Sequence, residues 1–558
     1  MPKRKRRTNE STKFSHLNIT NVLHEDSCQL LEYDNRIDVS VMPCANDSDV
    51  DSEWFSDDDL SHKEISNEIE NVLSYKQIVN NYSIDQKYLE EKHKYKWTSG
   101  EKMYDEVLKN EYLLTDKQRN HILASSSTQL FEIFFSKEMK THIIESSAEN
   151  DLHLSMSEFD TFLGIIILTI FNKRPEISDY WSTNPLLECS VVKSAMSRNR
   201  FQEIKGKIAY SKKSEQNQDD CVWRVRTIFQ IFRKNLKHFG FFQTAIAVDE
   251  MMVKFFGRLA IKQFIRNKPV RFGIKMWALC GADGFLFDCD IYGGKNATIV
   301  GKLKKCALGS RVVLGVLEKL FITTVRQKLK MYHLYCDNFF TSPDLFVHLQ
   351  SLGLRATGVV RKDRVKEKND LDKKAPRGTF AVKHDRTSGM NLITLMDSKE
   401  VSMLSTAAGV GSESSVKRYS KELKKKVEIK MPLAFTTYNK YMGGVDIHDQ
   451  YCSKASPSMK SKKWTFSVFL RMIESSIANA IILSNAVRPE KTKKSTVKDF
   501  AMEITQNYLS NSKLKNHNYY KKNKYKNCLY NCGKRSFFYC NECNQYICQT
   551  CWNESHAA

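Results

Sequence analysis

The stretch TAIAVD (Thr244–Asp249) is an apolar run that ends on an acidic residue, and MYHLYCD (Met331–Asp337) repeats this pattern further along the chain. Each run has the length and composition of a buried β-strand. Between them, IKMWALC (Ile274–Cys280) and FLFDCDIY (Phe285–Tyr292) flank a Gly-Ala-Asp-Gly turn, which predicts a β-hairpin. We therefore expect a sheet whose strands carry carboxylates at their ends.

Helical patterns alternate with these strands. RVVLGVLEKLF (Arg311–Phe321) and PDLFVHLQSLG (Pro343–Gly353) have apolar residues at helical spacing, and ATGVVR (Ala356–Arg361) is a further strand. The order is strand, hairpin, helix, strand, helix and strand. It predicts a mixed α/β sheet, in which site residues lie at the ends of the strands.

The charge of the chain points to a polyanion as partner. Its 558 residues include 87 Lys and Arg against 64 Asp and Glu, a formal net charge of +23. Residues 25–70 alone carry 15 acidic and two basic residues, a local net of −13, so the remainder carries +36. Clustered bases of this kind indicate nucleic acid, although a solvated basic surface has the same composition.

Neither a membrane span nor a secretory signal is expected. The longest aliphatic stretch, Phe162–Phe171, is about half the length that a membrane span needs, and no apolar segment follows the basic N-terminus. Residues 1–99 are polar and acidic, which predicts disorder. The basic cluster Lys3–Arg7 matches a nuclear import signal or a DNA-contacting arm, and we expect a nuclear protein with no membrane partner.

Four aspartates are candidates for chemistry. Asp249 and Asp337 follow apolar runs, and Asp446 and Asp449 in YMGGVDIHDQ share one face of a helix that begins near Gly443. Converging carboxylates repel each other when ionised. Two Mg²⁺ ions, or Mn²⁺ in their place, remove that repulsion and activate an oxygen nucleophile at a phosphodiester. The set therefore predicts a nuclease or strand-transfer enzyme.

The C-terminal tail has the spacing C-x3-C-x7-C-x2-C-x4-C-x2-C-x4-H, a strong signature of structural zinc. Its obvious ligands are Cys528, Cys532, Cys540, Cys543, Cys548, Cys551 and His556. In a cross-brace of two zinc sites, Cys528, Cys532, Cys548 and Cys551 share one ion. The other ion takes Cys540, Cys543, His556 and an eighth ligand, either His517 or a water; an incomplete second site is the alternative.

The blocks DEMMVKFFGR, KPVRFGIKMW, DNFFTS and YMGGVDIHDQ, in this order, resemble the conserved blocks of the piggyBac family of DDE transposases. The likeness covers roughly residues 100–558. It implies an α/β RNase H-like catalytic core with a split helical domain for dimerisation and DNA binding, an insertion domain and a zinc-binding cysteine-rich domain. The helical domain would comprise 100–243 and 453–527, the latter with a Lys-rich linker, and the core would comprise 244–361 and 432–452. The insertion would span 362–431 and the cysteine-rich domain 528–558.

The same resemblance implies an activity. Asp249, Asp337 and Asp446 would be the catalytic triad, with Asp449 as a fourth carboxylate. The reaction would be cut-and-paste transposition by a homodimer on double-stranded DNA: nicking at the transposon ends, formation and opening of a hairpin, and joining to TTAA targets. The tail would recognise the transposon ends.

Several basic residues are candidates for DNA contact. The resemblance points to Arg258 and Lys275 in the conserved blocks, while Phe256 stands where the family usually has a basic residue. A Lys-rich stretch interleaved with tyrosines precedes the tail and suits phosphate contact, or is a solvated linker. Its residues are Lys521, Lys522, Lys524 and Lys526.

Other interpretations stay open. One is a domesticated, catalytically silent descendant that binds DNA without moving it. Another is a chromatin reader or ubiquitin ligase built on the zinc tail, which leaves the carboxylate blocks unexplained. His448 lies between two of the aspartates and is either a satisfied histidine on the helix surface or a ligand of DNA or metal.

Overall fold

The structure of the chain, a computed structural model, describes most of the sequence. The described residues are 93–104, 109–266, 268–294, 306–369, 371–372, 374–411, 414–420, 424–489, 491–510, 519–528, 532–540 and 545–555. The acidic segment 25–70 and the basic cluster Lys3–Arg7 lie outside these residues, so the predictions made for them are not tested.

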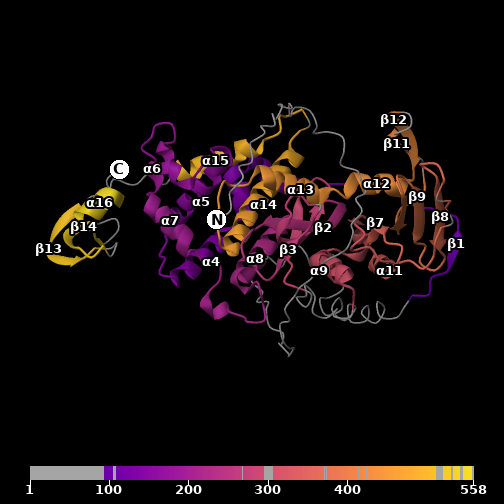
Figure 1. Ribbon diagram of the computed structural model, residues 1–558, viewed down its shortest axis with the longest axis horizontal. Coiled ribbons are helices and arrows are strands. Elements are labelled where there is room, and N and C mark those ends of the chain that lie inside the picture. The colour runs from indigo at the N-terminus through magenta and orange to yellow at the C-terminus, as the bar shows by residue number, and fades with distance from the viewer. Residues whose placement is uncertain are drawn as a thin grey trace, which may run out of the picture. The chain divides into compact units, whose positions relative to one another are not determined.

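One mixed sheet carries the predicted strands (Figure 1). β2 (Ala245–Lys254) is antiparallel to β4 (Phe272–Gly281) and parallel to β6 (His333–Cys336). β7 (Arg355–Val360) runs parallel to β6, and β5 (Leu286–Ile291) completes the predicted hairpin with β4. The strand and hairpin predictions for this region of the chain are therefore confirmed.

The sheet continues into the segment predicted as an insertion. β8 (Phe380–Asp385), β9 (Asn391–Met396) and β10 (Glu400–Ser405) form antiparallel pairs, and β10 pairs with β7. β1 (Trp97–Ser99) pairs with β8 at the far edge. Residues 362–431 thus extend the core sheet, and the prediction of disorder up to residue 99 is wrong for β1.

The remaining strands of this region are short. β3 (Lys262–Phe264) pairs with the beginning of β4, at the opposite end of the strand order from β1. β11 (Ser414–Ser420) and β12 (Lys425–Met431) form a separate two-stranded hairpin within the predicted insertion.

Helices surround the sheet, and most of the N-terminal ones begin at a Ser or Thr whose side chain accepts a backbone N–H. The first group is α2 (Asp116–Ala124), α3 (Ser127–Phe134), α4 (Lys137–Ala148), α5 (Met156–Phe171), α6 (Ser190–Ala195), α7 (Arg198–Lys207) and α8 (Trp223–Leu236). The second group is α9 (Leu308–Thr323), α10 (Arg326–Leu329), α11 (Pro343–Leu352), α12 (Leu433–Tyr441), α13 (Gly444–Lys454), α14 (Trp464–Val487) and α15 (Val497–Ser510).

The helix α14 connects the helical region to the sheet (Figure 1). By length and composition it passes as a membrane span, but 94% of its most apolar window is buried inside the protein, as in a core helix. Arg471 donates to the carbonyl of Met252 in β2, and Asn479 pairs with the backbone of Leu286 in β5. α14 and α15 also pack against α3, so the two predicted helical segments lie together.

The C-terminal tail begins earlier than predicted. β13 (Tyr519–Asn527), β14 (Arg535–Cys540) and β15 (Gln545–Tyr546) form a small antiparallel sheet, followed by α16 (Gln549–Ser555). The Lys-rich stretch before Cys528 is therefore a strand and not a linker, because its backbone pairs with β14. α15 likewise lies within the Lys-rich linker predicted over about residues 488–527.

Candidate active site and metal centre

Asp249 and Asp337 lie side by side on neighbouring parallel strands. Val248 in β2 is paired with Cys336, the last residue of β6, so the aspartates that follow these two residues lie next to each other. The carboxylate of Asp337 accepts hydrogen bonds from the N–H groups of Phe339 (2.8 Å) and Phe340 (3.4 Å). The end of β6 therefore holds one carboxylate in a fixed turn beside the other.

The two carboxylates are electrostatically coupled. Burial raises the pKa of Asp337 to about 7, and the negative charges of Asp249 and Glu250 add to this effect. An acid with such a pKa at the end of a strand carries an unfavourable charge at neutral pH. A cation placed between these groups would remove the repulsion.

The helix α13 brings the other two aspartates to the same place. It begins at Gly444, with Asp446 in its first turn, where the helix dipole favours a negative charge. A Cβ at Gly444 would lie 2.3 Å from the carbonyl oxygen of Gly281, and one at Gly284 would lie 2.8 Å from Ile447. Glycines at both positions let α13 approach the β4–β5 turn closely.

His448 is a structural support of this contact. Its Nδ1 lies 2.9 Å from the carbonyl oxygen of Gly284 and its Nε2 lies 3.0 Å from the hydroxyl of Ser475 in α14. Burial, together with the charge of Arg471, lowers the pKa of His448 to about 3. The histidine is satisfied, as one of the two predictions states, but it is buried and not on the helix surface, because α13 is covered by α14.

Lys268 supplies a positive charge among the aspartates. Its Nζ lies 3.2 Å from Oδ2 of Asp249 and 3.6 Å from Oδ1 of Asp446. The lysine side chain is 9% exposed, while that of Asp446 is 65% exposed. Lys268 therefore joins the strand aspartate to the helix aspartate, and solvent reaches the pair from the side of α13.

Asp449 is held by Arg471 of α14. The guanidinium Nη1 lies 3.0 Å from its Oδ1, and the same guanidinium lies 3.3 Å from Glu474. Burial raises the pKa of Asp449, while the charges of Arg471 and Lys268 oppose the shift. The sequence singles out neither Lys268 nor Arg471, because nothing in their spacing indicates contact with the distant aspartates.

The arrangement suits a divalent cation by its chemistry. Asp337 is repelled by the charge of Asp249 at the ends of two strands, Asp446 is linked to Asp249 through Lys268, and hard cations prefer such oxygen ligands. Among the described residues, however, the only group of three or more potential ligand atoms within 4.8 Å of one another is a set of cysteines. The aspartates are not drawn together to that degree, and Lys268 lies between two of them.

The predicted DNA contacts Lys275 and Arg258 have different surroundings. Lys275 pairs with Glu250 (2.5 Å), and its Nζ lies 4.0 Å from the ring centroid of Trp277. Trp277 in turn stacks on Phe339 of the Asp337 turn, at 5.5 Å. Arg258 is exposed, just after β2. Lys275 thus supports the turn that holds Asp337, whereas Arg258 is accessible.

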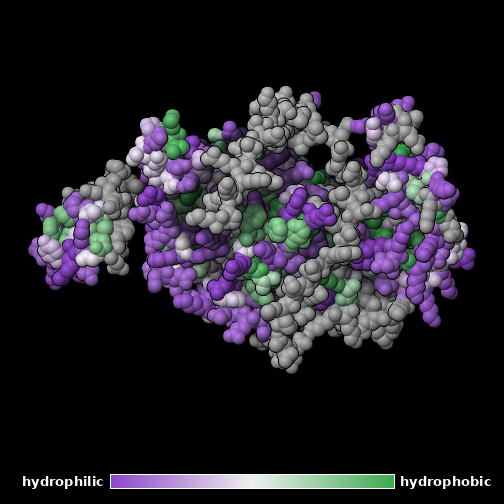
Figure 2. All heavy atoms as spheres, in the orientation of Figure 1, coloured by the Kyte–Doolittle hydropathy of each residue, from purple (hydrophilic) through white to green (hydrophobic). Residues whose placement is uncertain are grey.

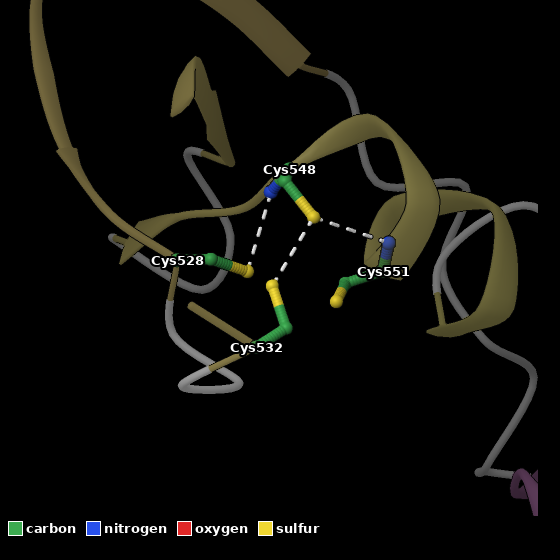
Figure 3. A group of neighbouring side chains, drawn as sticks. All are labelled: Cys528, Cys532, Cys548 and Cys551. Carbon is green, nitrogen blue, oxygen red and sulfur yellow. Dashed lines mark hydrogen bonds between the residues drawn. The ribbon is translucent and has the colours of Figure 1, made fainter. Parts of the chain in front are cut away.

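The tail contains a second, separate ligand set (Figure 3). The Sγ atoms of Cys528, Cys532, Cys548 and Cys551 all lie within 4.8 Å of one another. The Cys548 N–H donates to the Cys528 sulfur (3.3 Å), and the Cys551 N–H to the Cys548 sulfur (3.5 Å). A tetrahedral zinc with bonds of about 2.3 Å separates its sulfurs by roughly 3.8 Å. The set predicted for the first zinc is therefore brought together and fits that ion.

The second predicted zinc set is only partly described. Cys540 is fully buried at the end of β14, while Cys543, His556 and His517 lie outside the described residues. The predicted phosphate contacts Lys521, Lys522, Lys524 and Lys526 all lie on β13. Several of these lysines lie over aromatic rings, the nearest being Lys522, 3.1 Å from the ring centroid of Tyr539. They form a basic and aromatic strand.

Comparison with known proteins places the chain in a family. A family model described as Transposase IS4 matches residues 126–481. PiggyBac transposable element-derived protein 3 of Homo sapiens is 34% identical over 377 residues, which are 65% of this chain and 61% of that protein. PiggyBac transposable element-derived protein 2 of Homo sapiens is 27% identical over 367 residues, 64% of this chain and 61% of that protein. The chain thus matches less than two thirds of the length of these relatives.

A solved structure shares the fold. It is the cryo-EM structure of the piggyBac transposase synaptic complex with hairpin DNA. Its sequence is 21% identical to this chain, and the TM-score is 0.60. The likeness covers 79% of this chain and 98% of that one. At this level of identity it bears on the fold alone.

Proposed function

The chain belongs to the piggyBac family of transposases, and from this membership and the carboxylate site we propose that it is a DNA transposase of the cut-and-paste type. The proposed reaction nicks the ends of a DNA element, forms and opens hairpins, and joins the freed 3′-hydroxyls to TTAA targets. The proposed catalytic residues are Asp249, Asp337, Asp446 and Asp449, in a core of RNase H-like topology.

The observation that carries the proposal is the convergence of carboxylates from three separate elements. Asp249 and Asp337 come from parallel strands, and Asp446 comes from the first turn of α13. A fold that serves only to bind DNA gains nothing from burying Asp337, whose pKa is raised to about 7 by burial and by the charges of Asp249 and Glu250. Perturbed acids of this kind concentrate at functional sites.

The carboxylates would hold divalent cations, Mg²⁺ or Mn²⁺, which supply charge neutralisation and activation of an oxygen nucleophile at the phosphodiester. Asp249, Asp337 and Asp446 would bind the cations. Asp449, which is ion-paired with Arg471, would support the cation site from the side of α14. Solvent access on the α13 side, where Asp446 is 65% exposed, leaves room for a DNA strand.

The rest of the molecule would bind and pair the DNA. The net charge of +23 favours double-stranded DNA as partner, and the tail with its zinc ions would hold the transposon ends through the lysines of β13. Pairing of two ends requires two copies of the chain, so we propose a homodimer in the nucleus. The helical region would form the dimer contact.

Cleavage of a supercoiled plasmid that carries the cognate element ends tests the proposal. With Mg²⁺, the wild type is expected to cut at the element ends, while Asp249→Asn loses at least about 10³-fold in rate because transition-state stabilisation of several kcal/mol is removed. The matched control is Asp219→Asn, a substitution of an exposed loop aspartate, which should cut like the wild type.

One outcome would favour the second candidate function, a catalytically silent DNA-binding protein. The position of Lys268 between Asp249 and Asp446 supports that alternative, because an ammonium group already neutralises some of the negative charge of the site. If the wild type binds the element ends and yet gives no Mg²⁺-dependent cleavage, the enzyme proposal is overturned and the silent function stands.

A further inference from the structure

A second surface with an unusual composition shares the strands β2 and β4 with the carboxylate site. Residues 251–282 contain seven Lys and Arg and no Asp or Glu. This segment includes the end of β2, all of β3 and all of β4. Three of its phenylalanines are exposed, although most aromatic side chains of the described residues are buried. We refer to residues 254–266 and 268–272 as the aromatic–basic hairpin.

Two of the exposed phenylalanines form a pair across the strands. Phe264 in β3 is opposite Phe272 in β4, and their ring centroids lie 4.7 Å apart. The two side chains are 57% and 43% exposed. Figure 2 shows hydrophobic side chains at the surface beside hydrophilic ones where Figure 1 labels β3. Exposed apolar groups that adjoin a site commonly mark a binding surface.

The third phenylalanine lies at the same end of the sheet. The N–H of Phe255 donates to the carbonyl of Phe272, so Phe256 is one residue beyond the level of the pair. Its side chain is 70% exposed, and the Nζ of Lys254 lies 5.4 Å from its ring centroid. This chain therefore presents an aromatic ring at the position where the resemblance implies a basic residue.

The register places the phenylalanine pair on the sheet face that carries Asp249. Asp249 is opposite Ala278 in β4, and side chains six residues apart on a strand lie on the same face, about 20 Å apart. Ile274 and Met276, which lie between them on this face, are buried. The turn of the hairpin folds back, because its Lys268 reaches Asp249. The hairpin therefore connects the carboxylate site to the exposed rings within one structural unit.

Positive charges surround the rings. Arg258, Arg266 and Arg271 are exposed, and among the described residues no acidic side chain lies within ion-pairing distance of any of them. Exposed guanidinium groups without carboxylate partners are suited to phosphates. The combination of exposed aromatic rings with a basic rim is the one that proteins use for unpaired nucleotides, since bases stack on the rings while the phosphates contact the cations.

We propose that the aromatic–basic hairpin binds unpaired nucleotides of the DNA strand that runs through the carboxylate site, with bases stacked on Phe264 and Phe272. Intact duplex DNA would use the arginines but would leave the rings exposed, because its bases are stacked on one another. The inference rests on the proposed function for the identity of the partner. It concerns binding only, so its test needs no cleavage.

Binding of the full chain to two DNAs in EDTA tests the inference by fluorescence anisotropy. One DNA is a blunt duplex, and the other is the same duplex with a single-stranded extension of about six nucleotides. Because stacking on an aromatic side chain strengthens binding several-fold or more per base, the wild type should prefer the extended DNA by about 5- to 100-fold. The double variant Phe264→Ala/Phe272→Ala should lose this preference and keep its affinity for the blunt duplex.

Two further variants make the test specific. Phe264→Tyr/Phe272→Tyr retains aromatic faces and should keep the preference. Arg258→Gln/Arg271→Gln should weaken the binding of both DNAs by a similar factor and reduce the salt dependence. The inference is overturned if the alanine variant keeps the preference, or if it loses affinity for both DNAs equally. It is also overturned if the alanine variant changes only the oligomeric state, since the rings would then contact a second copy of the chain.

Failure of this inference is distinguishable from failure of the proposed function. A protein that cuts DNA but shows no preference for unpaired nucleotides loses the inference alone. A protein that binds the extended DNA through these rings and never cuts it keeps the inference and loses the enzyme proposal.

Discussion

The carboxylate site and the cysteine site are both suited to metal ions, but they relate to the fold in opposite ways. Asp249, Asp337 and Asp446 lie on a sheet and a helix that are held together by a large apolar core. Among the described residues of the tail, the buried cluster has six members, four of which are cysteines: Cys528, Cys540, Ile547, Cys548, Cys551 and Trp552. A metal ion would therefore add chemistry to the first site and structure to the second.

The two sites also differ in how their negative charges are stabilised. In the carboxylate site, Lys268 and Arg471 already compensate Asp249, Asp446 and Asp449. Burial opposes ionisation of Cys548, but hydrogen bonds from Cys551 and the neighbouring thiols lower its pKa to about 7. Cys548 therefore approaches the thiolate form that zinc requires, whereas burial and hydrogen bonds with the same thiols raise the pKa of Cys551.

The largest effect is expected from loss of the tail zinc. Cys548→Ser should reduce the zinc content measured by mass spectrometry by one ion per chain and make the tail sensitive to protease, because structural zinc contributes about 10–16 kcal/mol of apparent binding energy. The main unfolding transition should not move. Cys221→Ser, at an exposed cysteine, is the control and should keep all its zinc. A tail that stays protease-resistant in Cys548→Ser would show that it folds without this zinc.

The next effect concerns Arg471, the buried cation of the carboxylate site. Arg471→Met leaves Asp449 and Glu474 without their buried partner. The main body of the protein, by which we mean the chain before the tail, should therefore lose about 3–5 kcal/mol of stability. Chemical denaturation measures this loss, and Arg198→Met at an exposed arginine is the control. Equal stability of the two variants would show that the compensation described for the carboxylate site contributes nothing.

Asp337 should make the stability of the main body depend on pH in EDTA. Its folded pKa of about 7 lies above the value near 4 of an unfolded aspartate, so the folded chain binds more protons between these values and stability falls as pH rises. Asp337→Asn removes this loss. It should therefore gain stability relative to the wild type, by up to about 4 kcal/mol on going from pH 4 to above pH 7.

Thermal unfolding of the wild type, Asp337→Asn and the control Asp219→Asn from pH 4 to pH 8 checks this expectation. Parallel curves for all three proteins would mean that the carboxyl of Asp337 titrates normally. The tail should contribute no such difference, because it carries no comparable carboxylate among the described residues.

The smallest effect is expected from Lys268. Lys268→Met removes the ammonium that Asp249 and Asp446 share, at a cost of about 1.5–3 kcal/mol, and Mn²⁺ should restore more stability to this variant than to the wild type. Melting temperatures in EDTA and in Mn²⁺ measure both effects. Lys262→Met, whose ammonium contacts the carbonyl of Gly257 in the same hairpin, is the control. An identical response of both variants to Mn²⁺ would rule out a cation site beside Lys268.

The sequence predicts the candidate ligands better than it predicts their surroundings. Asp249 and Asp337 follow apolar runs that can only be buried strands, and the cysteines have fixed spacing, so both sets follow from local pattern. Lys268 and Arg471 belong to the carboxylate site through contacts over long sequence separations, which local pattern does not encode. Their roles appear only when the packing of β2, β4 and α14 in three dimensions is known.

The same distinction applies to the fold. β9 is fully buried, but it lies among basic and polar segments, so the average composition of residues 362–431 does not indicate that the strands of this predicted insertion continue the sheet. The composition of β13 indicates a linker because lysine dominates it, although its backbone pairs with β14 and Lys522 lies over Tyr539. In both cases the neighbouring strand, and not the segment itself, decides the structure.

The carboxylate site should take divalent cations independently of the tail. Electron paramagnetic resonance of Mn²⁺, added to the full chain with duplex DNA, measures this binding. We expect that the wild type binds Mn²⁺ and that Asp249→Asn/Asp337→Asn loses this binding while its zinc content stays unchanged. Equal Mn²⁺ binding by the wild type and the double variant would show that these aspartates hold no cation.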